Sequence, residues 1–398
     1  MQRNLKFPST LIGLIGLALL LLGCGELNGQ ETDRPDDSGA GIEKAIAPTD
    51  PPKQQIDIQN LTVRFPHEQN TYIGRVIARG GNRVLLQRRD GDLKFLEVPE
   101  EQKFKIISQT FEPHTPESLK IQLQEEFGSR YEVSATERCV VVHPTGESEY
   151  WAKPFETFID NFEFFFERYE YELTDAPFPY IIIVLRSRGD FDRYMRAQAN
   201  ITNRNVTGFY SIHSNRMVTY DPLARIRIPD KKRRSWLYGS PTVLHESAHQ
   251  LAFNRGVHNR LSPPLLWLSE GFAMLFEAPG FHRARDFTTL KDRVSRGRLT
   301  SLRRLYRGER IEGKLESLLV SDRLFRSDTE LAYSLAWGLT FYLAEKKPEK
   351  FRQFLRAYAT QPALLNQPSN ERIEAFASHF GTDIQKLEAE MKAFYVEE

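Results

Sequence analysis

The spacing of hydrophobic and polar positions differs between the two ends of the chain. Between residues 56 and 112, short β-prone runs at 61–65, 72–78 and 84–87 are separated by glycine, asparagine and aspartate turns. Such runs predict strands joined by tight turns. We therefore expect a small β-barrel or sheet module at 56–112, whose role is either that of a spacer or that of a binding surface.

From residue 113 onward, apolar residues recur at both strand and helix spacing. Helical patterns cover 117–127, 153–169 and 190–199, whereas 131–143 and 180–185 are apolar runs typical of strands and Gly208 to Tyr220 predicts a hairpin. In the second half, Ser240 and Pro241 signal the start of a helix that Gly256 should end. Further helices are expected at 268–277, 287–296, 331–346, 348–359, 370–380 and 383–395. Residues 113–398 should therefore form an α+β domain with a mixed sheet and a mostly helical C-terminal half.

The first residues are typical of an export signal. Arg3 and Lys6 carry positive charge, an apolar run covers 11–22, and the sequence Leu-Leu-Gly-Cys ends at Cys24. This ending resembles a bacterial lipobox, which implies cleavage before Cys24 and lipid attachment to it. We expect a signal peptide at 1–24, a disordered linker at 25–55 that is poor in large apolar residues, and a protein anchored to a membrane outside the cytoplasm. The alternative is a single transmembrane anchor, but the run is shorter than the roughly 20 residues that a bilayer requires.

The charge of the chain names no partner. Lys and Arg number 54 and Asp and Glu 53, which leaves +1 and gives no support for binding to nucleic acid. Basic stretches at 231–234 and 283–310 are expected to be solvated helix faces, with contact to anionic lipid headgroups or acidic cell-wall polymers as the alternative. The sequence does not define an oligomeric state.

A metal-binding pattern lies inside the helix that begins after Ser240. His245 and His249 are four residues apart, so both imidazoles project from one helical face and can reach one zinc ion. Glu246 is rotated away from the two ligands and is the candidate general base.

A third ligand is expected downstream, because a catalytic zinc ion has three protein ligands and one open position. The segment 267–273, Trp-Leu-Ser-Glu-Gly-Phe-Ala, resembles the gluzincin metallopeptidases, especially the M1 aminopeptidase-like branch. This resemblance implies that Glu270 is the third zinc ligand. Glu270 follows His249 by 21 residues, two more than is usual in that branch, and a loop with two prolines can absorb the difference.

Other ligand sets fit the sequence less well than Glu270 does. A metzincin would have Gly at position 252 and His at position 255, but this chain has Ala252 and Arg255. His258 and His282 are weaker candidates for the third ligand, and both are expected at the surface.

The helix around His245 also resembles the DUF1570 family. The residues that carry this likeness are Thr242 to Asn254, the segment that begins at Trp267, Gly208 to Ser211, Asn215, Arg216, and Tyr333 to Trp337. The resemblance spans roughly residues 115–345 and implies a gluzincin-like, thermolysin-like fold for the catalytic domain.

Two further sets of candidates depend on the gluzincin resemblance. Tyr333 follows Glu270 by 63 residues, and a tyrosine at that distance stabilises the oxyanion in related enzymes, although a helix-packing role is the alternative. The hairpin around Gly208, Asn215 and Arg216 resembles the edge strand that gluzincins place along the substrate cleft, and an ordinary hairpin is the alternative.

Two functions from different classes follow. The first is a lipid-anchored zinc metallopeptidase that hydrolyses peptide bonds in peptides or proteins, with a zinc-activated water and Glu246 as general base. The second is a non-catalytic, lipid-anchored binding or scaffold protein with a structural zinc site. The sequence does not separate endopeptidase from aminopeptidase activity.

Overall fold

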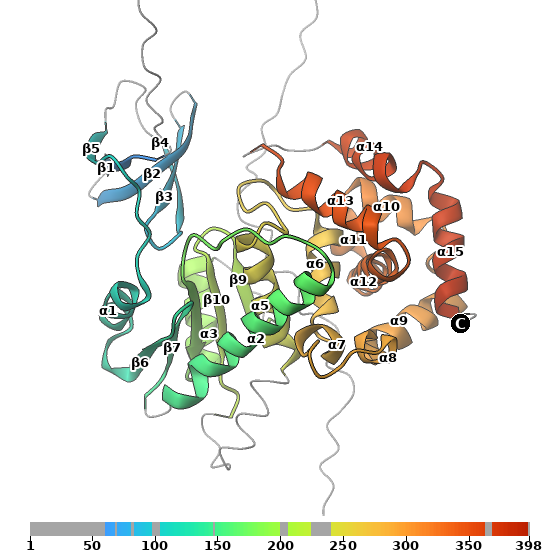
Figure 1. The fold of residues 1–398 in the computed structure, drawn as a ribbon, viewed down its shortest axis with the longest axis horizontal. Helices are drawn as coiled ribbons and strands as arrows, with labels where there is room; N and C mark the ends of the chain where they lie inside the picture. The colour runs from blue at the N-terminus through green and yellow to red at the C-terminus, as the bar shows by residue number, and fades with distance from the viewer. Residues whose placement is uncertain are drawn as a thin grey trace, which may run out of the picture.

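The computed structural model describes residues 60–67, 70–80, 83–97, 104–145, 148–199, 206–223, 240–362 and 368–396. The predicted signal peptide with Cys24, the predicted linker at 25–55 and the basic stretch at 231–234 lie outside these ranges. In chain order, the described residues form an N-terminal sheet, a second sheet with its helices, and a helical half (Figure 1). Within these ranges, none of the helices combines the length and the apolar character that crossing a bilayer requires.

The N-terminal sheet has five antiparallel strands in the order β4-β3-β2-β1-β5. One of its faces buries apolar side chains such as Val63, Phe65 and Leu86. A barrel closes only when its outer strands pair with each other. Here β4 and the short, fully exposed β5 are the two outer strands, so the sheet is open and the barrel-like form predicted for this module is wrong. The strands are β1 (Thr62–His67), β2 (Asn70–Gly80), β3 (Arg83–Arg88), β4 (Leu93–Glu97) and β5 (Lys105–Ser108).

The second sheet is mixed, as predicted, with the order β6-β7-β8-β10-β9. The pairs β7/β8 and β8/β10 are parallel, whereas β6/β7 and β10/β9 are antiparallel. Strands β7 and β8 are buried along their whole length because helices cover both faces, which explains their continuous apolar sequences. The elements of this part are α1 (Pro116–Phe127), β6 (Tyr131–Ala135), β7 (Cys139–Pro144), α2 (Ser148–Arg168), β8 (Tyr180–Leu185), α3 (Arg188–Tyr194) with a π-helical end η3 (Met195–Ala199), β9 (Gly208–Ser211) and β10 (Arg216–Tyr220).

The helical half follows most of the predicted pattern. Helices α5 (Pro241–Asn254), α6 (Leu266–Leu275) and α12 (Thr329–Lys346) form its centre, and the later ones pack around them. The helix predicted at 287–296 is wrong, because Val294 and Ser295 have extended backbone and separate α8 from α9. The remaining helices are α7 (Pro279–His282), α8 (Leu290–Arg293), α9 (Arg296–Arg307), α10 (Lys314–Val320), α11 (Arg323–Ser327), α13 (Pro348–Ala359), α14 (Ser369–Phe380) and α15 (Ile384–Val396).

Candidate metal centre

Helix α5 carries the first two candidate ligands. Its start is fixed by the Ser240 side chain, which accepts a hydrogen bond from the Val243 N–H, and by Pro241 in the first turn. The chain leaves the helix at Gly256, whose φ of 71° lies in the left-handed region that favours glycine. Almost the whole helix is buried, so the side chains of His245 and His249 face the protein interior.

Helix α6 carries the third candidate ligand and packs closely on α12. A Cβ added at Gly271 would lie 2.2 Å from Thr340 Oγ1 and 2.4 Å from the Ala336 carbonyl oxygen. Only a glycine permits this close approach of the two helices. Because Glu270 directly precedes Gly271, the contact with α12 also fixes the position of Glu270.

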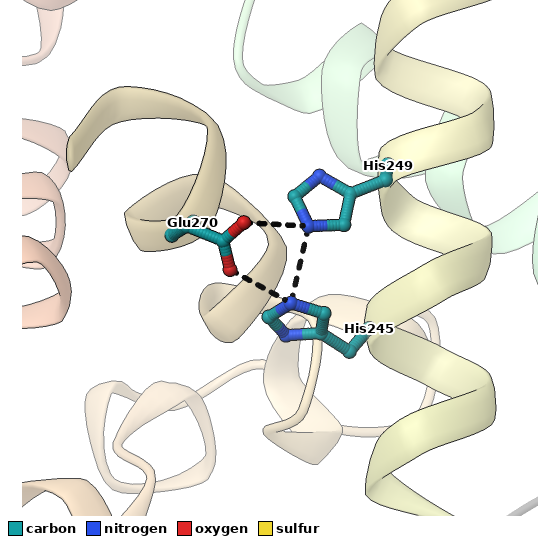
Figure 2. Close-up of side chains that lie close together, drawn as sticks. All are labelled: His245, His249 and Glu270. Atoms are coloured by element: carbon teal, nitrogen blue, oxygen red, sulfur yellow. Dashed lines mark hydrogen bonds and ion pairs between the residues drawn. The ribbon is translucent and has the colours of Figure 1, made fainter. Parts of the chain in front are cut away.

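The three candidate ligands meet at one point, with Glu270 facing both imidazoles from the neighbouring helix (Figure 2). His245 Nε2 lies 3.2 Å from Glu270 Oε2 and 3.1 Å from His249 Nε2. His249 Nε2 lies 3.6 Å from Glu270 Oε1. All three side chains are fully buried. The structure thus brings together the three residues that the sequence indicated as metal ligands.

The geometry and chemistry of these side chains fit a zinc ion. Four ligands at about 2.0–2.1 Å from zinc in a tetrahedral arrangement are separated by about 3.3 Å, and the observed separations of 3.1–3.6 Å lie around this value. Two histidines and one glutamate are also a common donor set of catalytic zinc sites. Glu270 Oε1 is buried without a hydrogen-bond partner in the described part of the chain, so it is free to act as a ligand.

The electrostatics of the metal-free triad are those of an ion pair. Burial alone would lower the pKa of His245, but Glu270 and Glu277 outweigh it and raise the pKa to about 10. Burial would raise the pKa of Glu270, but the two histidines lower it to about 2. Without a metal ion, a protonated His245 therefore balances the Glu270 carboxylate.

Glu246 lies next to the triad and contacts the edge of the second sheet. Its Oε2 accepts a hydrogen bond of 2.8 Å from the main-chain N–H of Tyr210 in β9. A Cβ added at Gly208 would lie 3.5 Å from Glu246 Cγ and 2.6 Å from Thr242 Cγ2, so β9 and α5 are in close contact there. Burial, followed by the charge of Glu270, raises the pKa of Glu246 to about 8, although His245 opposes the rise.

Glu277 and Arg298 support the triad and were not found from the sequence. Glu277 Oε1 lies 3.2 Å from His245 Nδ1, the nitrogen on the far side of the ring from the triad. Arg298 donates two hydrogen bonds to the same carboxylate, and both side chains are buried. The arginines of the 283–310 stretch were expected on a solvated face, and for Arg298 this is wrong. Helical spacing from Glu270 could not have indicated Glu277, because α6 ends at Leu275 and Glu277 lies in the turn that follows.

Tyr333 lies near the triad on α12. Its side chain is buried, and its ring packs edge-on against Phe325 with centroids 5.2 Å apart. Burial raises its pKa well above the ordinary value, and the neighbouring negative charges of Glu270 and Glu246 add to the rise. The hydroxyl is therefore a neutral hydrogen-bond donor near both carboxylates.

The three predicted substrate contacts have different surroundings. Gly208 lies beside Glu246, as described above. Asn215 is fully buried and bonded to Tyr210 and Asn254, and Arg216 forms an ion pair with Glu126 on α1. The structure does not bring the Asn215 and Arg216 side chains to the triad, and a role of these residues in substrate binding stays a prediction.

Neither rival histidine joins the triad. His258, expected at the surface, is buried with an exposed fraction of 2%, because its ring packs against Phe253 and Phe272. His282 is half-buried, and its Nδ1 lies 2.8 Å from the Phe276 carbonyl oxygen. Within the described residues, the triad of His245, His249 and Glu270 is the only group of this kind that could hold a metal ion.

Comparison with known proteins finds a family match in the second half of the chain. No curated protein matches it. Residues 240–364 match the family described as "Protein of unknown function (DUF1570)". This range begins later than the resemblance over residues 115–345 and extends slightly beyond its end. The stretch that matches this family contains both ligand helices and Tyr333.

Proposed function

We propose that the protein is a zinc-dependent metallopeptidase of the gluzincin type that hydrolyses peptide bonds and is anchored by a lipid on Cys24 outside the cytoplasm. The observation that carries the proposal is the convergence of His245, His249 and Glu270, with one ligand atom from each within 4.8 Å of the others. Glu246 supports it, because the candidate base lies on the same helix as two of the ligands.

The chemistry assigned to the protein is divided between the metal ion and the side chains beside it. When bound, zinc would act as a Lewis acid toward water and the substrate carbonyl. Glu246 would accept the proton of the attacking water and pass it to the leaving amine nitrogen. A cation in the triad would lower the pKa of Glu246 from about 8, which favours the carboxylate form that a base requires.

The Tyr333 hydroxyl would donate a hydrogen bond to the developing oxyanion, in addition to the interaction with the metal ion. An oxyanion needs donors that are in place before the reaction, and a buried neutral hydroxyl is such a donor. The raised pKa keeps the proton on Tyr333 at all working pH values. His245 and His249 would remain neutral ligands, and Glu277 would hold the His245 ring in its orientation.

A peptide substrate is supported by the sheet edge beside Glu246. Strand β9 is the outer strand of the second sheet, and its Tyr210 N–H already contacts Glu246. An extended peptide can pair with such an edge and would then pass next to the base. Gly208 permits the close contact that holds this strand against α5, since any Cβ there would crowd Thr242.

The decisive experiment compares the native chain with Glu246→Gln. Zinc content is measured by elemental analysis and hydrolysis by mass spectrometry of a digested peptide library. We expect about one zinc ion per chain in both proteins and cleavage only in the native one. Zinc without cleavage would favour the non-catalytic scaffold with a structural zinc site, and the absence of zinc would reject both functions. The lipid anchor is tested by labelling the protein with a fatty acid, and the label should be lost in Cys24→Ala.

A further inference from the structure

The loop that joins the two ligand helices is fixed by a buried arginine. Residues 255–265 connect α5 to α6, and Arg260 lies in the middle of this loop with an exposed fraction of 8%. Its guanidinium donates to three main-chain carbonyls, those of Ile212, His213 and Gly91. The first two belong to the β9–β10 turn, and the third belongs to the β3–β4 turn of the N-terminal sheet.

The charges at this contact are complementary. Asp90 and Asp92 lie in the β3–β4 turn, and both are buried. Their negative charges counter the guanidinium of Arg260, which has lost its hydration through burial. A planar guanidinium can donate to several carbonyls at once, whereas a lysine offers only one compact group. The contact is therefore specific for arginine.

A second route leads from the same turn to the helix that carries the histidines. Gly91 has a φ of 86°, and a Cβ there would lie 3.0 Å from Asn215 Nδ2. The Asn215 carbonyl accepts a hydrogen bond from the Gln250 side chain, and its side-chain oxygen accepts one from Asn254. Gln250 directly follows the ligand His249, so the contacts run without a gap from the N-terminal sheet to α5.

We propose that the N-terminal sheet is part of the framework that sets the metal-site geometry, and that Arg260 is the positioning residue that couples the two. The inference rests on the metal site of the proposed function but not on catalysis. On this proposal the N-terminal sheet is not a passive spacer. Because energetic coupling between two sites is reciprocal, metal binding must also stabilise the β3–β4 turn.

The test uses the full chain and Zn²⁺ alone as the probe. Amide hydrogen exchange of residues 88–93 is measured with and without Zn²⁺, and zinc affinity is measured by competition with a chromogenic chelator. In the native protein, Zn²⁺ should slow exchange in the turn. In Arg260→Met this response should be lost and the affinity should fall about 10–100-fold, as for other residues that support metal ligands. Arg260→Lys should recover only part of the affinity.

The matched control is Arg83→Met, which makes the same change at an exposed ion pair of the same sheet. Arg83→Met should keep the native zinc affinity and the native slowing of exchange in the turn. If Arg260→Met does not fold, the coupling is tested by whether Zn²⁺ slows amide exchange in the β3–β4 turn of the native protein. Gly91→Ala then replaces it as the variant, because it crowds Asn215 without removing a charge.

The outcomes separate this inference from the proposed function. Zinc binding with unchanged exchange in the turn and native affinity in Arg260→Met would overturn the coupling and leave the peptidase proposal intact. If the native chain bound no zinc, the proposed function would fail. The coupling would then be judged in the metal-free protein, where Arg260→Met should speed exchange in α5 and α6, and equal exchange would overturn it.

Discussion

Zinc binding should release about two protons from this protein at pH 7. The charged side chains enclosed around the triad are three carboxylates, Glu246, Glu270 and Glu277, and one guanidinium, Arg298. With every carboxylate ionised and neutral histidines, their net charge is −3 + 1 = −2, which matches a divalent cation. Burying an uncompensated charge of −2 would be costly, so the metal-free protein must take up protons instead.

The pKa values identify where these protons reside. His245, with a pKa of about 10, and Glu246, with a pKa of about 8, are both largely protonated at pH 7. Glu270 is ionised because its pKa is about 2, and His249 is neutral because burial lowers its pKa. The metal-free site is then neutral. A zinc ion requires neutral His245 and an ionised Glu246, so its binding displaces one proton from each.

The assay is isothermal titration calorimetry of Zn²⁺ in buffers with different ionisation enthalpies, whose slope gives the number of protons released. We expect about two at pH 7 and about one near pH 9, where Glu246 is already ionised. Glu246→Gln should release only the proton of His245, about one. A native value near zero at pH 7 would refute the reasoning, because it would mean that the site carries its negative charge without compensation.

Three substitutions test the support of the site. Glu277→Gln leaves Arg298 without its counter-charge, so the free energy of unfolding should fall by about 3–5 kcal/mol. Zinc affinity, measured by chelator competition, should fall about 10–100-fold. Glu345→Gln, which breaks a comparable pair with no histidine, should leave zinc affinity unchanged. Tyr333→Phe should keep zinc and lower kcat about 100- to 1,000-fold with little change in KM, and an unchanged kcat would leave Tyr333 only a packing role. Gly271→Ala forces α6 away from α12 and should lower the unfolding free energy by about 1–3 kcal/mol with weaker zinc binding. Gly189→Ala, which meets only ordinary contacts within α3, should neither lower the unfolding free energy nor weaken zinc binding.

Local sequence signals predicted the ligand helix well. Ser240, Pro241 and Gly256 act within one helical turn of the residues they affect, and α5 begins and ends where they indicate. The spacing of His245 and His249 is likewise a local property of the helix. Glu270 needed the likeness of its segment to a known family, because nothing in the 21 residues after His249 fixes how the chain returns to the imidazoles.

The long-range partners could not be predicted in the same way. Arg298 is 21 residues from Glu277, and Arg260 is 169 residues from Gly91. An arginine within a basic stretch has the same local pattern whether its partner is water or a buried carboxylate. The burial of the Asn215 side chain could not be predicted either. It depends on how the β9–β10 turn, in which Asn215 has a positive φ of 59°, packs in the folded protein. Such contacts depend on tertiary structure, which local periodicity does not describe.

The geometry of the candidate metal centre depends on the positions of two helices and one loop. His245 and His249 keep their spacing by helix geometry alone, but Glu270 meets them only if α6 keeps its distance from α5. That distance is set on one side by the contact of Gly271 with α12 and on the other by the loop fixed through Arg260. A displacement of α6 by 1 Å would change the separations of 3.2 and 3.6 Å between Glu270 and the two imidazoles by about a third. Substitutions at these packing contacts should therefore weaken metal binding even though they leave every ligand in place.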